Sequence, residues 1–217
     1  MKAVLFDLDG TLIDSDEDIA AAVNQTLEEL GRPKRSLAEI RTMIGRGARD
    51  LLARALDSSD DAAIEAARAR FVRHYTAAPV AHTKIYPGVI ELLEALHRQG
   101  LALGVATNKP IALAAPIVKA LGLDRAGIRG VAAADEVERR KPDPAVLALA
   151  LERTCPGTPP AEVVYVGDMG LDVETARAFG AAAVGVGWGF SRATVIAAGP
   201  DVFIERPEEL LAWMKTR

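Results

Sequence analysis

Hydrophobic residues along the chain form short continuous runs that alternate with longer stretches of helical periodicity. Four apolar runs stand at residues 4–6, 103–107, 163–167 and 183–187, and each is followed by a helical pattern. One such pattern begins after Pro87, where apolar residues recur at i, i+3, i+4 and i+7 until Gly100 ends the stripe. Strands that alternate with helices are typical of a parallel sheet. The pattern therefore predicts an α/β fold with a parallel sheet.

Residues 16–80 break this alternation, because they show one helical pattern after another and no convincing strand. A stripe of apolar residues ends at Gly31, Ser36 and Glu39 have the spacing of a capping box, and two further helices are expected at about 51–56 and 62–76. We therefore expect a core formed by residues 1–15 and 81–217, with residues 16–80 inserted as a helical domain.

Composition narrows the class of protein. The chain has 217 residues, of which 50% are hydrophobic, and this is enough to bury a sizeable core. Its net charge of -4 argues against nucleic acid or an anionic membrane as the main partner. The single cysteine, Cys155, excludes an internal disulfide and a cysteine-rich zinc site. With no signal-like or membrane-spanning run, we expect a cytoplasmic protein, either monomer or homodimer.

Two carboxylates, Asp7 and Asp9, follow the first apolar run and precede Gly10. Alternate side chains on an extended strand point to the same side, so the pair could share one face of the chain. Like charges held this close need a cation or a shared proton. Since Asp and Gly are also ordinary turn formers, a solvated turn is the alternative interpretation.

Further polar residues follow the predicted strands, and ligands of parallel α/β sheets bind at these carboxyl ends. The exception is Lys141, which precedes a helix expected to open at Asp143-Pro144 and to run through about Arg153. The set consists of Thr11, Thr107, Asn108, Lys109, Lys141, Asp168 and Asp172. Several acids, a hydroxyl, an amide and a lysine together suit a phosphoryl group held with a hard divalent cation. Mg²⁺ prefers such oxygen ligands.

Four motifs occur in a characteristic order: Asp7-x-Asp9-Gly10-Thr11, the strand-ending Thr107, Lys141-Pro142, and Gly167-Asp168-x-x-x-Asp172. In this order the chain resembles a haloacid dehalogenase superfamily phosphatase with a helical cap, and the similarity spans essentially its whole length. The resemblance implies a Rossmann-like core sheet and a cap formed by the inserted helices.

The resemblance also implies roles for individual residues. Asp7 would be the nucleophile that forms an aspartyl-phosphate, and Asp9 the acid that protonates the leaving group and then activates water. Mg²⁺ would lie among Asp7, the Asp9 carbonyl and Asp168, with Asp172 as a ligand or a support. The phosphoryl oxygens would be bound by the Thr107 hydroxyl, the Asn108 amide and Lys141.

The acid at position 9 separates activities within the superfamily. Dehalogenases resemble this pattern without it, because a departing halide needs no proton, so Asp9 favours phosphate chemistry. Sugar-phosphate mutases resemble the chain in keeping both acids, and a non-catalytic binding protein on the same scaffold is a further alternative. The leading interpretation is a Mg²⁺-dependent phosphomonoesterase.

The candidate for substrate selection is Gly45-Arg46-Gly47, which precedes a predicted helix in the insert. Glycines allow close backbone approach, and a helix N-terminus favours an anion, so a small substrate carboxylate would fit there. Alternatively, the glycines make a tight turn and Arg46 is solvated. The run resembles the cap loop of bacterial phosphoglycolate phosphatases, which makes 2-phosphoglycolate the best single substrate. Nucleotides, sugar phosphates and pyrophosphate remain alternatives.

Overall fold

A six-stranded parallel sheet forms the centre of the molecule within residues 1–215, which the computed structural model describes. The strand order is β5-β4-β1-β6-β7-β8. The strands are β1 (Ala3–Phe6), β4 (Ala102–Thr107), β5 (Ile128–Ala133), β6 (Val163–Gly167), β7 (Ala182–Val186) and β8 (Val202–Ile204). This confirms the predicted α/β class. The last two residues of the predicted core segment 81–217 lie outside the described residues.

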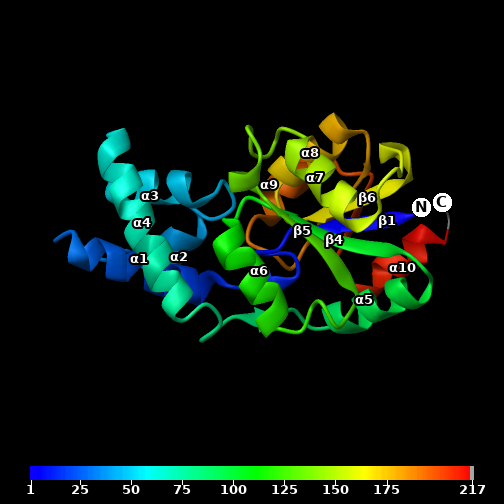
Figure 1. The fold of residues 1–217 in the computed structure, drawn as a ribbon, viewed down its shortest axis with the longest axis horizontal. Helices are drawn as coiled ribbons and strands as arrows, with labels where there is room; N and C mark the ends of the chain where they lie inside the picture. Colours follow the sequence, from blue (N-terminus) through cyan, green and yellow to red (C-terminus); the bar gives the residue numbers. More distant parts are fainter. Residues whose placement is uncertain (216–217) are drawn as a thin grey trace.

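Helices cover both faces of this sheet, as Figure 1 shows. On one face lie α5 (Val89–Arg98), α6 (Ile111–Ala120) and α10 (Glu208–Met214); on the other lie α7 (Ala145–Thr154), α8 (Gly170–Phe179) and α9 (Arg192–Ala198). Successive side chains of β1 point to opposite faces of the sheet: Val4 and Phe6 pack toward α5, while Ala3 and Leu5 pack toward α7. Burial on both faces explains why the strands read as continuous apolar runs.

Four further helices lie beyond one end of the sheet, at the left of Figure 1. They are α1 (Asp16–Glu29), α2 (Leu37–Arg41), α3 (Ala48–Leu56) and α4 (Asp61–Ala77), and α4 packs against both α1 and α3. The chain enters and leaves this group through a short antiparallel pair, β2 (Ile13–Asp14) and β3 (Lys84–Ile85). Ser36 and Glu39 form the expected capping box at α2. We call residues 16–80 the cap.

The sequence patterns missed parts of the sheet. β5 reads Ile-Arg-Gly-Val-Ala-Ala, and β8 has only three residues, so neither presents a clear apolar run. One helix boundary also differs, because α7 begins at Ala145 rather than at Asp143-Pro144. Asp143 still caps this helix from just before it, since its Oδ1 accepts a hydrogen bond from the Ala145 N–H at 3.0 Å.

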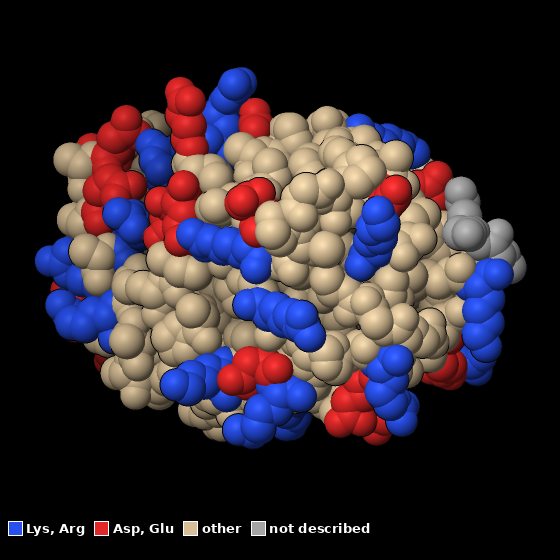
Figure 2. Space-filling model, turned by 45° about the vertical axis from the view of Figure 1, so that its right-hand side comes forward, with Lys and Arg blue, Asp and Glu red and all other residues tan. Residues whose placement is uncertain are grey.

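Charged side chains of both signs are interleaved over the face drawn in Figure 2, most densely over the cap at its left. Exposed ion pairs on the cap include Arg68 with Glu65 and Arg73 with Glu29. None of the helices within residues 1–215 combines the length and the apolar character that a membrane span requires.

Candidate active site

Three neighbouring strands of the sheet end at one place, and each delivers a polar side chain there. Asp7 follows β1, Thr107 ends β4, and Asp168 follows β6. Because β1 lies between β4 and β6, these carboxyl ends meet at the centre of the sheet edge. All three side chains are buried. The structure thus brings together the residues that the sequence placed on separate strand ends.

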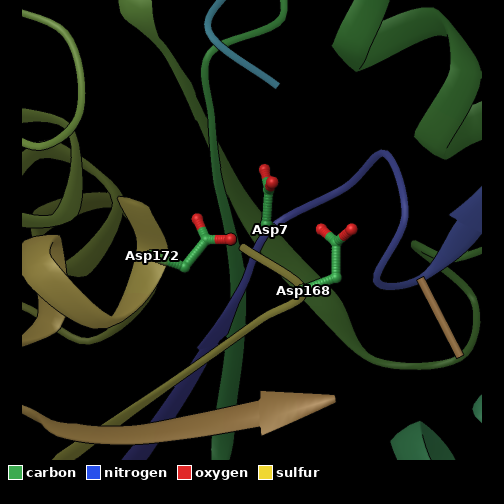
Figure 3. A group of neighbouring side chains, drawn as sticks. All are labelled: Asp7, Asp168 and Asp172. Carbon is green, nitrogen blue, oxygen red and sulfur yellow. The ribbon is translucent and has the colours of Figure 1, made fainter. Parts of the chain in front are cut away.

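Asp7, Asp168 and Asp172 form a compact acidic cluster, and Figure 3 shows their three side chains close together at the end of the strands. One carboxylate oxygen of each lies within 4.8 Å of the others, and all three residues are buried. The Lys141 ammonium offsets part of this charge, lying 3.0 Å from Asp7 Oδ1 and 2.7 Å from Asp172 Oδ1. Three carboxylates and one ammonium leave an excess of two negative charges. An all-oxygen site with that excess fits a hard divalent cation.

Burial and the neighbouring charges shift the pKa values of the residues in this cluster. Burial raises the pKa of Asp7 to about 6, although Lys141 counters this effect and Asp172 reinforces it. Burial, together with Asp172 and Asp7, raises the pKa of Asp168 well above its ordinary value. Burial works against the charged form of Lys141, but Asp172 and Asp7 outweigh it and raise the pKa of this lysine. Lys141 is therefore a permanent cation beside the cluster.

Asp172 uses both of its carboxylate oxygens in contacts within the protein. Oδ1 accepts hydrogen bonds from Lys141 Nζ at 2.7 Å and from the Tyr165 hydroxyl at 3.2 Å. Oδ2 accepts from the Met169 N–H at 3.0 Å, which caps the first turn of α8. The arrangement holds Lys141 against Asp7.

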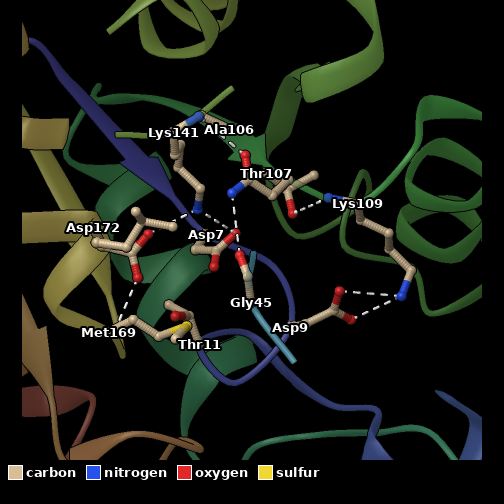
Figure 4. Close-up of polar contacts among 12 residues, drawn as sticks. Asp7, Asp9, Thr11, Gly45, Ala106, Thr107, Lys109, Lys141, Met169 and Asp172 are labelled. Atoms are coloured by element: carbon tan, nitrogen blue, oxygen red, sulfur yellow. Dashed lines mark hydrogen bonds and ion pairs between the residues drawn. The ribbon is translucent and has the colours of Figure 1, made fainter. Parts of the chain in front are cut away.

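The Asp9 carboxylate is held apart from this cluster, and Figure 4 shows it turned toward Lys109. Lys109 Nζ lies 2.9 Å from Asp9 Oδ1 and 3.1 Å from Oδ2, and the Ser15 hydroxyl donates to Oδ1 at 2.6 Å. The chain has already left its strand here, since the Leu12 N–H donates to the Leu8 carbonyl at 3.0 Å. The extended conformation that would place Asp7 and Asp9 side by side therefore ends before Asp9.

Thr107 and Asn108 connect the end of β4 to the surrounding loops. Thr107 Oγ1 accepts from the Lys109 N–H at 3.2 Å. The Asn108 side-chain amide donates to the Gly45 carbonyl of the cap at 3.1 Å, and its oxygen accepts from the Lys141 N–H at 3.1 Å. Asn108 thus bridges the cap loop and the segment that carries Lys141.

A pocket of about 40 Å³ lies between the cap and this site. Its walls include Asp7, Asp9, Thr107, Gly45 and Gly47. Gly47 is the N-cap of α3, so the Gly45-Arg46-Gly47 run directly precedes a helix, as predicted. Arg46 does not line the pocket and its side chain is exposed, so the structure brings the two glycines to the site but not the arginine between them.

Several residues at the site had no assigned role in the sequence. The Phe190 N–H donates to Asp168 Oδ2 at 2.7 Å, and its ring lies 5.0 Å from the Arg41 guanidinium of the cap. Gly10 has φ +83°, and a Cβ there would collide with the Asp168 carboxylate. Lys109 stands out because its side chain is only 4% exposed. The position of Lys109 after a predicted strand indicated that it lies near the site, but its contacts could not be predicted because its partners are distant in sequence.

The amino-acid sequence is similar to those of known hydrolases. Residues 4–186 match the model of the haloacid dehalogenase-like hydrolase family. A phosphoglycolate phosphatase of Rhodospirillum rubrum is 40% identical over 98% of this chain and 90% of that protein. One of Pseudomonas syringae pv. syringae is 38% identical over 90% of this chain and 73% of that protein.

Solved structures agree with the sequence comparison. The crystal structure of a predicted phosphoglycolate phosphatase from Haemophilus somnus has a TM-score of 0.89 and 29% identity, covering 99% of this chain and 98% of that one. A putative phosphoglycolate phosphatase from Lactobacillus delbrueckii has a TM-score of 0.85 and 25% identity, covering 96% of each chain. The chain therefore belongs to the haloacid dehalogenase-like hydrolase family.

Proposed function

We propose that the protein is a Mg²⁺-dependent phosphomonoesterase that acts on a small phosphorylated carboxylate, with 2-phosphoglycolate as the best substrate. The observation that carries this proposal is the buried cluster of Asp7, Asp168 and Asp172 with Lys141 as its one ammonium. A site with this charge accommodates a divalent cation and the phosphate that the cation attracts. We assign residues 1–15 and 81–217 to the core domain and residues 16–80 to the cap domain.

In the proposed reaction, an Asp7 carboxylate oxygen attacks the phosphorus atom of the substrate. The bond between phosphorus and the leaving oxygen breaks, and Asp9 gives that oxygen its proton. Asp9 then accepts a proton from a water molecule whose oxygen attacks the phosphorus of the aspartyl-phosphate. The bond between the Asp7 oxygen and phosphorus then breaks, which releases phosphate and restores the Asp7 carboxylate. To reach the leaving oxygen, the Asp9 carboxylate must break its hydrogen bonds with Lys109 and Ser15.

The phosphoryl oxygens would be bound by the Thr107 hydroxyl, Asn108 and Lys141. Lys141 is suited to this because its charge is fixed by Asp7 and Asp172 before substrate arrives. Asp7, the Asp9 carbonyl and Asp168 would hold Mg²⁺, with Asp172 in support. The ion would supply Lewis-acid stabilisation of the transferring phosphoryl group.

Two observations support a small substrate. The pocket between the cap and the core is small, about 40 Å³, which suits a two-carbon leaving group better than a hexose. The similar proteins of Rhodospirillum rubrum and Pseudomonas syringae carry the name phosphoglycolate phosphatase. We propose a cytoplasmic enzyme of small-molecule metabolism, monomer or homodimer, that binds neither nucleic acid nor membrane.

A substrate panel tests the proposal. Phosphate release is measured from 2-phosphoglycolate, a nucleoside monophosphate, ribose 5-phosphate, glucose 1-phosphate and pyrophosphate, each with Mg²⁺ and with a chelator. We expect the highest kcat/KM for 2-phosphoglycolate and no turnover with the chelator. Equal or higher efficiency on a sugar phosphate would refute the substrate assignment. Isomerisation of glucose 1-phosphate without free phosphate would identify a mutase, and no release from any substrate would refute the phosphatase.

A further inference from the structure

Lys109 is buried at the boundary between the core and the cap, and it makes three side-chain contacts there. Its ammonium donates to both oxygens of Asp9, at 2.9 and 3.1 Å, and to the Tyr75 hydroxyl of α4 at 2.8 Å. The ammonium also lies 4.2 Å from the centre of the Tyr75 ring. Placing a lysine out of solvent is costly unless it is paired. Nothing in the reaction proposed above uses this residue.

Lys109 also lines the pocket between the cap and the core. Of the described residues that line it, Lys109 is the only cation, and Tyr75 stands beside it. The wall around these two is largely apolar, formed by Ile19, Ile44, Leu51, Phe71 and Leu113. An anionic leaving group that enters this space finds the countercharge of Lys109 and, at the wall, the N-terminus of α3. Arg46 lies outside it, with its side chain in solvent.

The contact between Lys109 and Asp9 holds Asp9 away from the position that the proposed reaction requires. Asp9 must reach the leaving oxygen, yet two of its hydrogen bonds hold it on Lys109. A second carboxylate at the same ammonium would compete for those donors and weaken its hold on Asp9. The Tyr75 hydroxyl accepts from Lys109, and its own proton is given to no group among the described residues. It is therefore free to donate to an incoming carboxylate.

We propose that Lys109, with Tyr75, is the specificity-determining pair of this enzyme: it binds a carboxylate on the leaving group and thereby releases Asp9 for proton transfer. The inference rests on the proposed phosphatase function. It makes recognition and catalysis one event, because a substrate without the second anion leaves Asp9 on Lys109. The preferred substrates are phosphomonoesters whose leaving group carries a carboxylate close to the ester oxygen.

The test compares two substrates of matched size, 2-phosphoglycolate and 2-hydroxyethyl phosphate, which lacks the carboxylate. The wild-type protein should prefer 2-phosphoglycolate in kcat/KM. In Lys109→Met, kcat/KM for 2-phosphoglycolate should fall by about 10- to 100-fold, the loss expected for a charge-assisted contact. The value for 2-hydroxyethyl phosphate should stay the same or rise, since Asp9 is no longer held. A merely structural role would lower both values together.

Three further variants sharpen the result. Lys119→Met removes an exposed lysine at the end of α6 and should leave the preference unchanged. Tyr75→Phe keeps the ring over Lys109, removes only the hydroxyl, and should reduce the preference even if Lys109→Met does not fold. Arg46→Gln should keep the preference.

The inference is overturned if Lys109→Met keeps the wild-type preference, if it lowers kcat/KM equally for both substrates, or if Arg46→Gln alone abolishes the preference. Equal kcat/KM of the wild-type protein on the two substrates would also overturn it, while leaving the phosphatase intact. A wild-type protein that hydrolyses neither substrate would instead refute the proposed function.

Discussion

A single lysine offsets part of the buried negative charge of the site. Lys141 lies between Asp7 and Asp172, its side chain is 1% exposed, and a cation–π contact places its ammonium 5.5 Å from the centre of the Tyr165 ring. Removing one partner of a buried ion pair leaves the other charge uncompensated, which costs far more than the loss of an exposed pair. The stability of the metal-free protein should therefore depend on Lys141 as much as its activity does.

We predict that Lys141→Met lowers the free energy of unfolding of the metal-free protein by roughly 3–5 kcal/mol at pH 7.5. The loss should shrink at pH 5. Burial raises the pKa of Asp7 to about 6, so the folded state binds a proton more tightly than the unfolded state does. Stability linked to Asp7 is therefore present at low pH and is lost as pH rises through about 6.

Denaturant unfolding at the two pH values measures this effect, with Lys119→Met as the exposed-lysine control. Lys141 lowers the pKa of Asp7 in the wild-type protein, so the pH dependence should be steeper in the variant. A destabilisation that is the same at pH 5 and pH 7.5 would contradict the role assigned to Lys141.

How far the sequence predicted the site can be judged from particular residues. Asp7, Thr107 and Asp168 each follow a recognisable strand, so the rule for parallel strand ends was enough to gather them. Lys141 was placed by the helix signal that follows it. The partners of Lys109 could not be predicted in the same way. Asp9 is 100 residues away and Tyr75 is on a cap helix, and no local pattern encodes contacts so distant in sequence.

At the scale of elements, the loop before α3 joins the cap to the core. Gly45 has φ +109°, its carbonyl accepts from Asn108, and a Cβ at this position would collide with the Met169 side chain. Met169 follows Asp168 directly, so the cap loop touches the segment that carries the acidic cluster. Gly45 therefore meets two constraints: a positive φ that favours glycine, and the Met169 side chain of the core, which would have to move to admit a Cβ.

We predict that Gly45→Ala lowers kcat/KM by about tenfold, because a side chain at this positive φ and against Met169 displaces the cap loop from the site. A loss of about 1.4 kcal/mol of transition-state stabilisation corresponds to that factor. Steady-state kinetics on 2-phosphoglycolate measures the change. Met169→Ala in the same chain removes the colliding atoms and should recover part of the loss.

Gly157→Ala is the matched control, since this glycine also has a positive φ, at +78°, but a Cβ there meets nothing within 4 Å. It should lower stability without lowering kcat/KM. Equal kinetic effects of the two substitutions would show that backbone strain alone, and not cap placement, explains the Gly45 result.

Elements were predicted where one face or both faces carry a strong apolar pattern. The stripe of α5 and the capping box of α2 are encoded within a few residues, so both were found. β5 was missed because Arg129 and Gly130 interrupt it, and its place at the sheet edge comes from pairing with β4. Such pairing is a tertiary effect that strand propensity does not contain.

The molecule as a whole consists of a sheet core and a helical cap that share one apolar cluster, and several further contacts join the two beside the site. Asn108 contacts Gly45, Lys109 contacts Tyr75, and Phe190 contacts Arg41. Each of these core residues lies next to, or bonds to, a residue of the proposed chemistry. The position of the cap is therefore tied directly to the residues of the site.

We predict that Mg²⁺ stabilises the whole molecule through its acidic cluster. At a concentration a hundredfold above its Kd, a ligand of the folded state adds about 2.7 kcal/mol, which corresponds to a rise in Tm of about 5–10 °C for a chain of this size. Thermal unfolding with and without Mg²⁺ measures the shift.

Asp168→Asn should remove most of this shift and should raise the Tm of the metal-free protein, because it deletes one of three mutually repelling charges. Asp57→Asn, at an exposed position with φ 51°, is the control and should keep the wild-type shift. A full Mg²⁺ shift in Asp168→Asn would exclude the cluster as the metal site.

The central claim is that phosphate passes through Asp7, and chemical trapping of the intermediate tests it most directly. The wild-type protein is mixed with Mg²⁺ and ³²P-labelled 2-phosphoglycolate, quenched in acid within the first turnover, and digested. Label is expected on the peptide that contains Asp7, with borohydride reduction converting that residue to homoserine. Asp7→Asn should show neither label nor turnover. Rapid phosphate release without labelled protein, or turnover that persists in Asp7→Asn, would contradict the account.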